Sequence, residues 1–421
     1  MLNSVESQFT QDFVIGNNSD KYDASCIVQV LYYFYTSAIK STKEQRLDTQ
    51  YEELSTFYAQ KKKNWITALL KLGLVKEAKV LAEKYHDFAS LARILDTERD
   101  SKSIEQLNYG LYFEEFGYPF AACVYEHYIN NGEYQKLLLE FSNYKHFLLQ
   151  YFKQNPESTS SVSWIRYLLD DDFELASKAL GLAASYNKEL INNQLTQLSL
   201  GKLSAIAVGA STKKQFDNEL MKVRYQIKVR DVVAGGGRIA AIKKENFASQ
   251  FLNKKIDKAD ANSIAANIFG PLSSDLRLNE LLLIELLTVI EPKFLQDYGF
   301  VYALKVAQTF SNEEHTNESI NIILLRLLTL GTEVKHTING TDDVVKHEVE
   351  SSILFKTLVS QPNIVSQLNQ LLENVNLNDT LNPSLSEFDE KLLNELKKRL
   401  DDDSFRSWVH MVIEQAKIVI I

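Results

Sequence analysis

Long runs of leucine, alanine, glutamate, lysine and glutamine fill this chain, and few residues interrupt them. Its 421 residues include 15 Gly and 6 Pro, too few for the many turns that an all-β chain needs. With 45% hydrophobic and 24% charged residues, the composition is typical of a folded globular protein and not of a disordered one. We therefore predict an all-α protein.

The length predicts two units or one elongated stack, because single cores rarely grow beyond about 250 to 300 residues. The clearest local signal runs from Asn64 to Phe88, where two helices with apolar residues at three-to-four spacing meet at a turn at Leu72 and Gly73. This pattern predicts an αα-hairpin. The helix pairs along the chain keep no fixed period, which indicates an elongated, irregular helical stack of the α-solenoid kind.

We expect a boundary in the segment Gln154–Ser163, because Pro156 ends the preceding helix and the Ser/Thr run after it has little to bury. The prediction is a helical stack over residues 1–155 and a C-terminal helical block over residues 156–421. In that block, Asp275–Ile290 is apolar nearly all round and is expected at the centre. Ser386 with Asp389 is expected to cap a helix. An apolar stripe should dock the last helix, through Phe405, Trp408, Val409, Val412, Ala416 and Val419.

Composition also limits the environment and the ligands. Cys26 and Cys123 are the two cysteines and lie far apart, which fits a reducing compartment and supports neither a disulfide framework nor a zinc site. No apolar run reaches the roughly 20 residues that span a bilayer, so no transmembrane segment is expected. The first residues lack the basic and apolar regions of a secretory signal.

Three features that could suggest chemistry have plainer interpretations. The seven histidines never form a helical zinc pair with an intervening glutamate. Val232–Lys244, with its three glycines, lacks the ending of a phosphate-binding loop, and we interpret it as a loop between helices. The aspartates at 170–172 and 401–403 each precede a helix, where carboxylates cap free amides. No nucleophile motif is present, so we predict a non-enzyme without metal, cofactor or small-molecule substrate.

The charge is unevenly distributed. Residues 213–258 hold twelve Lys or Arg against five Asp or Glu, a net +7, which leaves −16 for the rest of a chain whose net charge is −9. The overall sign argues against a general nucleic-acid binder. A solvated helix face and an anionic partner both remain open for this window. Its four aromatic residues are too few to suggest base stacking by the window itself.

An apolar run from Leu198 to Val208 stands out. Ser199 and Gly201 are expected to break the helix there, leaving a short second helix with small residues that would let a foreign helix approach closely. A groove floored by alanines and edged by leucines would accept an amphipathic helix. The alternative is that another helix of this same chain fills the groove.

Three segments resemble the family of the 133-kilodalton nucleoporin, a scaffold at the stem end of the Y-shaped outer-ring complex of the nuclear pore. Glu83–Glu98 is similar to the family's E-K-Y-x-D-F-x-x-L signature. Val124–Phe141 is similar to a segment ending G-x-x-x-K-L-L. Ser163–Ala207 opens with SWI, where the family shows S-W-L, and carries E-x-A, L-G-L-A and L-x-L-x-K-L-x-A-x-A. The three segments follow the family's order within a span, residues 83–207, of about a third of the chain.

The resemblance implies a position and a partner. Such proteins have an N-terminal β-propeller with a membrane-sensing loop; none is visible here, so we expect this chain to represent the C-terminal stack. The block after the Ser-Trp motif would bind the tail of a neighbouring stem nucleoporin, the 84-kilodalton protein of yeasts or its 107-kilodalton vertebrate counterpart. The positions that match the binding motif, with Tyr186 as a further candidate on the preceding helix, are Leu198, Leu200, Leu203, Ala205, Ile206 and Ala207.

The resulting hypothesis is a structural scaffold of the nuclear pore outer ring, at the nuclear envelope. It would join the neighbouring stem nucleoporin tail-to-tail and support nucleocytoplasmic transport and mRNA export. Two alternatives stand beside it: a nucleic-acid or chromatin adaptor acting through residues 213–258, and an unrelated vesicle-coat helical solenoid.

Overall fold

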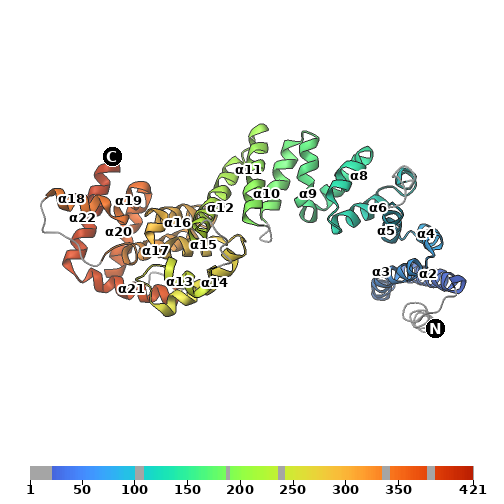
Figure 1. Cartoon of the computed structure of the whole chain (residues 1–421), viewed down its shortest axis with the longest axis horizontal. Helices are drawn as coiled ribbons and strands as arrows, with labels where there is room; N and C mark the ends of the chain where they lie inside the picture. The colour runs from blue at the N-terminus through green and yellow to red at the C-terminus, as the bar shows by residue number, and fades with distance from the viewer. Residues whose placement is uncertain are drawn as a thin grey trace. The chain divides into compact units, whose positions relative to one another are not determined.

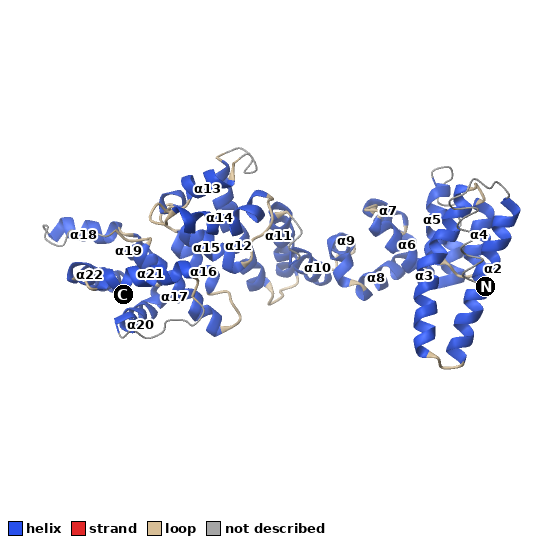
Figure 2. Cartoon of the chain, turned by 90° about the horizontal axis from the view of Figure 1, so that it is seen from below, coloured by secondary structure: helices blue, strands red, loops and turns tan. Residues whose placement is uncertain are grey.

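The computed structural model describes residues 21–99, 109–185, 190–235, 242–333, 342–376 and 385–420. Within these ranges every regular element is an α-helix or a 3₁₀-helix (Figure 2). Pairing of the β type is limited there to two isolated bridges, Leu190 with Leu276 and Leu252 with Ile290. The predicted all-α class is confirmed. Contacts between residues divide the chain into two compact units, residues 1–166 (unit 1) and residues 167–421 (unit 2). Figure 1 colours the chain by residue number, from blue at the N-terminus to red at the C-terminus.

Unit 1 consists of consecutive helices in which each packs mainly against its neighbours in sequence. Its elements are α2 (Lys21–Glu44), α3 (Asp48–Lys71), α4 (Val75–Lys84), α5 (Phe88–Arg99), α6 (Tyr109–Asn130), α7 (Tyr134–Glu140), η3 (Ser142–Tyr144), α8 (Lys145–Gln154) and α9 (Pro156–Leu169). The predicted αα-hairpin is formed by α3 and α4. Gly73 provides the turn with a φ of 76°, and the N–H of Leu74 donates to the carbonyl of Leu69 at 2.9 Å.

The E-K-Y-x-D-F signature has a structural role in unit 1. Asp87 is buried between α4 and α5, where its Oδ2 accepts a hydrogen bond from the Tyr32 hydroxyl at 2.7 Å and its Oδ1 forms an ion pair with Lys62 at 3.0 Å. Tyr85 stacks on the Tyr32 ring, with centroids 5.0 Å apart. Burial and the Asp87 carboxylate together raise the pKa of Tyr32 far above its ordinary value. The signature therefore ties the turn between α4 and α5 to α2 and α3.

The segment Gln154–Ser163 differs from expectation. Pro156 does follow the end of α8, but it is also the first residue of α9, which continues to Leu169. Thr159, Ser160 and Ser163 are almost completely buried, so the Ser/Thr run does pack inside the unit, contrary to the prediction. The division between the two units lies within α9, between Arg166 and Tyr167.

Unit 2 contains the remaining helices around one large apolar core. They are α10 (Phe173–Ser185), α11 (Ile191–Ala207), α12 (Lys213–Ala234), α13 (Lys244–Phe251), α14 (Lys258–Ser273), α15 (Glu280–Val289), η5 (Pro292–Leu295), α16 (Gly299–Ala307), α17 (Glu313–Thr329), α18 (Asp342–Ser351), α19 (Ile353–Ser360), η6 (Pro362–Ile364), α20 (Val365–Asn376), α21 (Glu387–Leu400) and α22 (Asp403–Ile420).

The apolar segment 275–290 lies at the centre of unit 2, as predicted. Its helix, α15, packs against α12, α14, α16 and α17. The helix begins at Glu280 and not at Asp275, because the Asn279 side chain caps it by accepting the N–H of Leu282 at 2.8 Å. Leu283, Ile284 and Val289 are buried on different sides of α15, which explains why it is apolar nearly all round.

The two last helices are formed largely as expected. Ser386 Oγ accepts the N–H of Asp389 at 3.1 Å and donates to its carboxylate at 2.6 Å, so the predicted cap of α21 is confirmed. In α22, five of the six stripe residues are buried. Val419 is the exception, with 55% of its surface exposed; Ile418 and Ile420 beside it are exposed as well, so the last turn of α22 is uncovered.

Candidate functional site

Helix α11 carries the residues that match the binding motif. It is one continuous helix from Ile191 to Ala207, so the predicted break at Ser199 and Gly201 is wrong. The helix ends beyond the motif: Gly209 adopts a φ of 66°, and the N–H of Ala210 donates to the carbonyl of Ala205 at 2.9 Å. This geometry is a Schellman motif, so Gly209, the residue after Val208, terminates α11.

The physical reason for Gly201 is close packing. A Cβ at this position would lie 2.5 Å from Phe216 Cε1 of α12 and 3.3 Å from Leu180 Cβ of α10. Glycine at this position therefore allows α11 to approach both α10 and α12 closely. This packing keeps the backbone of α11 helical at Gly201. The weak helix propensity of glycine, on which the prediction of a break rested, is overridden by tertiary contacts.

One side of α11 is buried in the chain itself. Leu198 (2% exposed) and Ala205 (0% exposed) belong to a small core with Phe216, Leu220 and Val223 of α12. Two of the predicted site residues are thus held by neighbouring helices of this chain. Their packing fixes the orientation of α11, and with it the direction of the opposite face.

The opposite side of α11 is apolar and open. Leu203 is 62% exposed and Ile206 49% exposed, Ala207 is also exposed, and Leu200 is half-buried. These four residues recur at three-to-four spacing, which puts them on one face of the helix. We call Leu200, Leu203, Ile206 and Ala207 the α11 face. The remaining candidate, Tyr186, lies outside the described residues.

A hollow adjoins the buried side of α11. It has a volume of about 380 Å³ and lies between α10 and α12, with Leu198, Gly181, Leu182 and Phe216 among its walls. Leu198 therefore lines both the small core and an opening next to it. Sequence reasoning did not identify this hollow, because its walls come from three helices and no single segment signals it.

A charged cluster borders the same hollow. Lys222 is buried and contacts Glu219 at 2.7 Å and Glu280 at 3.1 Å, and Arg277 pairs with Glu219 as well. Burial tends to raise the pKa of Glu219, but Arg277 and Lys222 together hold it below its ordinary value. The cluster joins α12 to the start of α15 and so anchors the α10–α12 helices to the central core.

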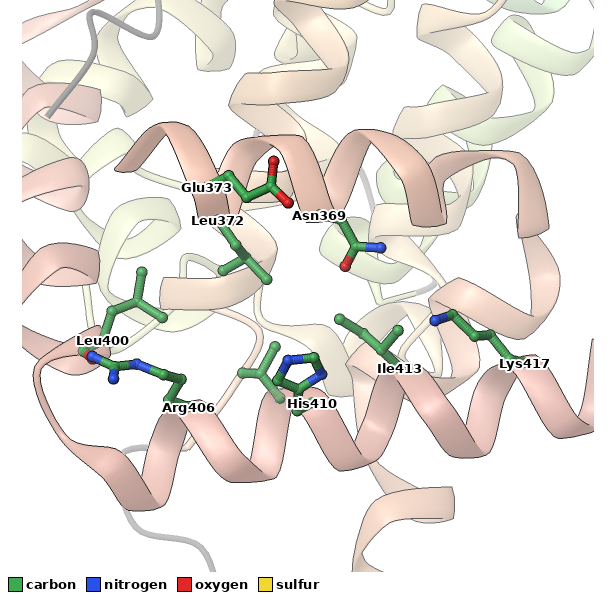
Figure 3. A pocket seen from close by; sticks show the side chains of 9 residues that line it. Asn369, Leu372, Glu373, Leu400, Arg406, His410, Ile413 and Lys417 are labelled. Atoms are coloured by element: carbon green, nitrogen blue, oxygen red, sulfur yellow. The ribbon is translucent and has the colours of Figure 1, made fainter. Parts of the chain in front are cut away.

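Another hollow, of about 340 Å³, lies between α20 and α22 (Figure 3). Leu372 and Ile413 point into it, whereas Glu373, Arg406 and Lys417 give its walls charges of both signs. Its mixed walls contrast with the uniformly apolar α11 face. Exposed apolar side chains without charges among them are typical of the centre of a protein–protein interface. The α11 face is therefore the stronger candidate for partner binding.

The features interpreted as non-functional have structural roles. Asp172 Oδ1 accepts the N–H of Leu175 at 3.0 Å, and Asp402 Oδ1 accepts the N–H of Ser404 at 2.9 Å, so both aspartate clusters cap helices as predicted. The segment before the three glycines is helical, as part of α12, and Gly235 ends it with a φ of 54°. Residues 236–241 of that loop lie outside the described residues.

The described ranges form neither a metal-binding cluster nor a membrane-spanning helix. There, no group of three or more His, Cys, Asp or Glu side chains is arranged to hold a metal ion. None of the helices described combines the length and the apolarity required to cross a bilayer.

Comparison with known proteins gives a family match. The model of the non-repetitive/WGA-negative nucleoporin C-terminal family matches residues 25–418. Among curated relatives, nucleoporin nup132 of Schizosaccharomyces pombe is 26% identical over 179 residues, 42% of this chain and 15% of the relative. NUP133 of Saccharomyces cerevisiae is 24% identical over 214 residues, 49% of this chain and 18% of the relative.

A similar match extends to animals. Nuclear pore complex protein Nup133 of Drosophila melanogaster is 27% identical over 229 residues, 53% of this chain and 18% of the relative. In each of these three cases the aligned region spans 18% or less of the relative's length.

Proposed function

This chain belongs to the non-repetitive/WGA-negative nucleoporin C-terminal family, whose place is the nuclear pore complex in the nuclear envelope, and we propose that it acts there as a structural scaffold. The relatives it matches are named as nucleoporins and nuclear pore proteins, which supports a role in assembly and not in catalysis. The family match also favours the nuclear pore over a vesicle coat.

We propose that the scaffold forms by tail-to-tail binding through the α11 face. The partner would be the neighbouring stem nucleoporin of the Y complex, the 84-kilodalton protein in yeasts or its 107-kilodalton counterpart in vertebrates. One observation carries this proposal: Leu203 and Ile206 are largely exposed on a helix whose other side is locked in the core by Leu198 and Ala205. A rigid helix with an open apolar face needs little reorganisation before it binds.

The expected energy of burial is modest for each side chain and adds up over the α11 face. Covering the exposed parts of Leu203 and Ile206 contributes roughly 1 to 2 kcal/mol each, at about 25 cal/mol per Å² of apolar surface. Leu200 and Ala207 extend the same contact. A partner helix that laid its apolar side on these four residues would use the helix-in-groove mode of recognition.

The two blocks have different parts in this proposal. Residues 156–421 hold the neighbouring nucleoporin, and residues 1–155 extend the stem. Placement of the outer ring in this way would support nucleocytoplasmic transport and mRNA export, with no reaction carried out by the chain itself.

The test compares two leucine substitutions with similar exposure. Leu203→Asp puts a charge into the proposed contact, where it would be buried without a counter-charge. Leu139→Asp is the matched control, because Leu139 is 59% exposed on α7 of unit 1 and lies outside the α11 face. The two variants and the unchanged chain are mixed with the purified partner tail and analysed by gel filtration and calorimetry.

We expect Leu203→Asp to abolish the complex and Leu139→Asp to leave it intact. Far-ultraviolet circular dichroism and the melting temperature should be the same for both variants, because both side chains point to solvent. A complex that survives Leu203→Asp and Ile206→Asp together would remove the α11 face from the proposal.

A further inference from the structure

The tertiary structure assembles tyrosines and cations that no single segment of the sequence carries. Helices α12 and α16 pack against each other in unit 2 (Figure 1). Tyr225 of α12 stacks on Tyr302 of α16, with ring centroids 4.2 Å apart and an interplanar angle of 21°. Tyr298, at the start of α16, stacks on Tyr302 at 6.2 Å and 23°. We call these three residues the tyrosine ladder.

The ladder has an accessible end. Tyr298 is 41% exposed, whereas Tyr225 and Tyr302 are half-buried. Burial is the larger cause and the neighbouring Tyr302 the smaller one of a rise in the pKa of Tyr225 to about 12. The Tyr225 hydroxyl therefore carries no charge near neutral pH. The ladder therefore presents aromatic surface without adding negative charge.

Cations flank the ladder on both helices. Lys228 Nζ donates to the Tyr302 hydroxyl at 3.0 Å and lies 4.8 Å from its ring centroid. Arg224 is exposed one turn before Lys228 on α12. Lys305 follows Tyr302 by three residues and so shares its face of α16.

Arg224, Lys228 and Lys305 are less neutralised by carboxylates than two other cations of α12, Lys222 and Arg230. Lys222 and Arg230 are engaged by carboxylates, at 2.7 Å to Glu219 and 2.9 Å to Asp231. Among the residues that the structure describes, no carboxylate lies within ion-pair distance of Arg224 or Lys305. The acidic neighbour of Tyr298, Asp297, is paired with Lys356 at 2.6 Å.

We propose that the tyrosine ladder and its flanking cations bind single-stranded nucleic acid. An unpaired base continues the stack on Tyr298, and Arg224, Lys228 and Lys305 contact the adjacent phosphates. Stacking on an aromatic ring tolerates every base, so binding depends on unpaired bases and not on a defined sequence. An acidic peptide would engage the cations but would gain nothing from the planar ladder, which is why the nucleic acid is favoured.

The experiment uses the full chain and labelled oligonucleotides of about 12 residues, a length within the usual single-strand site sizes. Fluorescence anisotropy is measured with oligouridylate, with oligothymidylate and with a fully paired duplex, at about 50 mM and about 200 mM salt. The first two probes distinguish RNA from DNA as the source of the strand. Polyglutamate serves as a competitor that has charge but no bases.

We expect Tyr298→Ala to weaken binding of the single strands at least about fivefold, the lower end of what one stacked base contributes. Tyr298→Phe should retain it, because the ring is preserved. Arg224→Gln with Lys228→Gln should reduce both the affinity and its dependence on salt. The matched controls are Tyr134→Ala, where the side chain is 39% exposed on α7, and Lys153→Gln on α8.

Three outcomes would overturn the proposal. The single strands could fail to bind at low salt, or the controls could weaken binding as much as the ladder variants do. The third outcome is competition by polyglutamate together with insensitivity to Tyr298→Ala, which would identify the surface as a site for an acidic protein.

Discussion

Gly201 of α11 lies directly against the ring of Phe216 of α12. A Cβ at Gly201 would lie 2.5 Å from Phe216 Cε1 and 2.8 Å from Cζ, well inside van der Waals contact. Because Phe216 is itself buried, the ring has little room to move. This contact sets the distance between α11, which carries the proposed partner-binding face, and α12, which carries Tyr225 of the tyrosine ladder.

We predict that Gly201→Ala destabilises unit 2 by about 1 to 3 kcal/mol, as overpacking of a core usually does. Urea denaturation followed by circular dichroism measures the change. Gly270→Ala is the control: Gly270 is also helical, and apart from its chain neighbours nothing lies within 4 Å of its would-be Cβ, so alanine should have a much smaller effect there. Equal effects of the two substitutions would contradict the close-packing account of Gly201.

Arg326 and Asp389 form a buried ion pair between α17 and α21. Arg326 Nε lies 2.8 Å from Asp389 Oδ1 and Nη2 lies 3.0 Å from Oδ2, and both residues are at most 5% exposed. Arg326→Leu should cost about 3 to 5 kcal/mol, because it leaves Asp389 buried without a counter-charge. Replacing both residues with leucine should cost less than this single change. Unfolding in urea measures both.

The exposed pair of Lys178 with Glu174 provides a control for that prediction. Both side chains are 65% exposed, and Lys178→Leu should change stability by less than about 1 kcal/mol. If the double replacement of Arg326 and Asp389 proves as costly as Arg326→Leu alone, packing and not charge burial would explain the loss.

Glu285 on α15 should make the stability of unit 2 depend on pH. Burial raises its pKa above the ordinary value; Arg326 opposes this shift and Asp389 adds to it. The folded state therefore favours the protonated carboxyl, and this contribution to stability is lost as pH rises through the raised pKa. Glu285→Gln should be more stable than the unchanged chain at about pH 7, and the gain should vanish near pH 4.

Thermal unfolding at several pH values checks this expectation. Glu373→Gln on α20 is the comparison, since Glu373 is exposed and its substitution should change stability little. A Glu285→Gln variant whose stability relative to the parent is the same at every pH would disprove the assignment.

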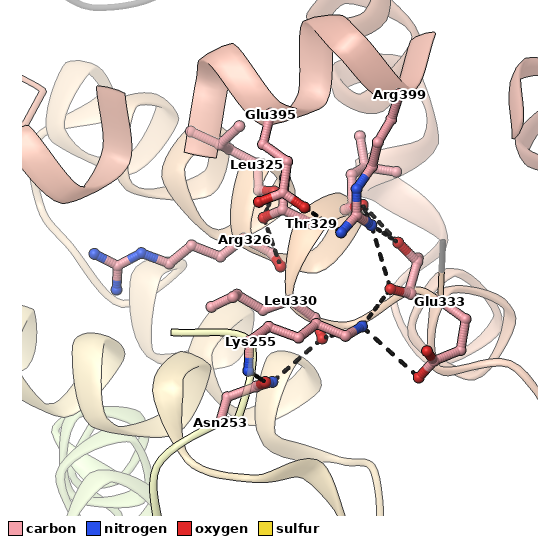
Figure 4. Close-up of polar contacts among 11 residues, drawn as sticks. Asn253, Lys255, Leu325, Arg326, Thr329, Leu330, Glu333, Glu395 and Arg399 are labelled. Carbon is pink, nitrogen blue, oxygen red and sulfur yellow. Dashed lines mark hydrogen bonds and ion pairs between the residues drawn. The ribbon is translucent and has the colours of Figure 1, made fainter. Parts of the chain in front are cut away.

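Lys255 and Arg399 hold the C-terminal end of α17 (Figure 4). Lys255 Nζ donates to the carbonyl of Leu330 at 3.2 Å, and Arg399 Nη1 donates to the carbonyls of Leu328 and Thr332, each at 3.3 Å. Cations at this end of a helix donate hydrogen bonds to the free carbonyls and interact favourably with the negative end of the helix dipole. We predict that Lys255→Met costs about 1 to 3 kcal/mol.

The neighbouring lysine gives the control for this last substitution. Lys254→Met removes an exposed side chain and should have little effect on stability. Chemical denaturation compares the two variants directly, and a similar small loss in both would show that the end of α17 does not depend on the Lys255 ammonium.

The local parts of the fold could be read from the sequence because they depend on neighbours within a few residues. Helical periodicity, the turn at Gly73 and the cap at Ser386 are set by spacing of 3.6 residues and by side chains that reach their own backbone. The same local reasoning failed at Gly201, where a glycine was interpreted as a helix break although its neighbour in space, Phe216, determines its role.

By itself, then, the sequence determined the all-α class, most of the helices and the segment of interest on α11, since each follows from local pattern. Only the tertiary structure decided which motif residues are buried, with Leu198 and Ala205 inside and Leu203 and Ile206 outside. It alone brought Tyr225 next to Tyr302. These results depend on contacts between residues far apart in the chain. A periodic pattern in the sequence predicts that a helix has an apolar face, but it does not indicate which surface covers that face.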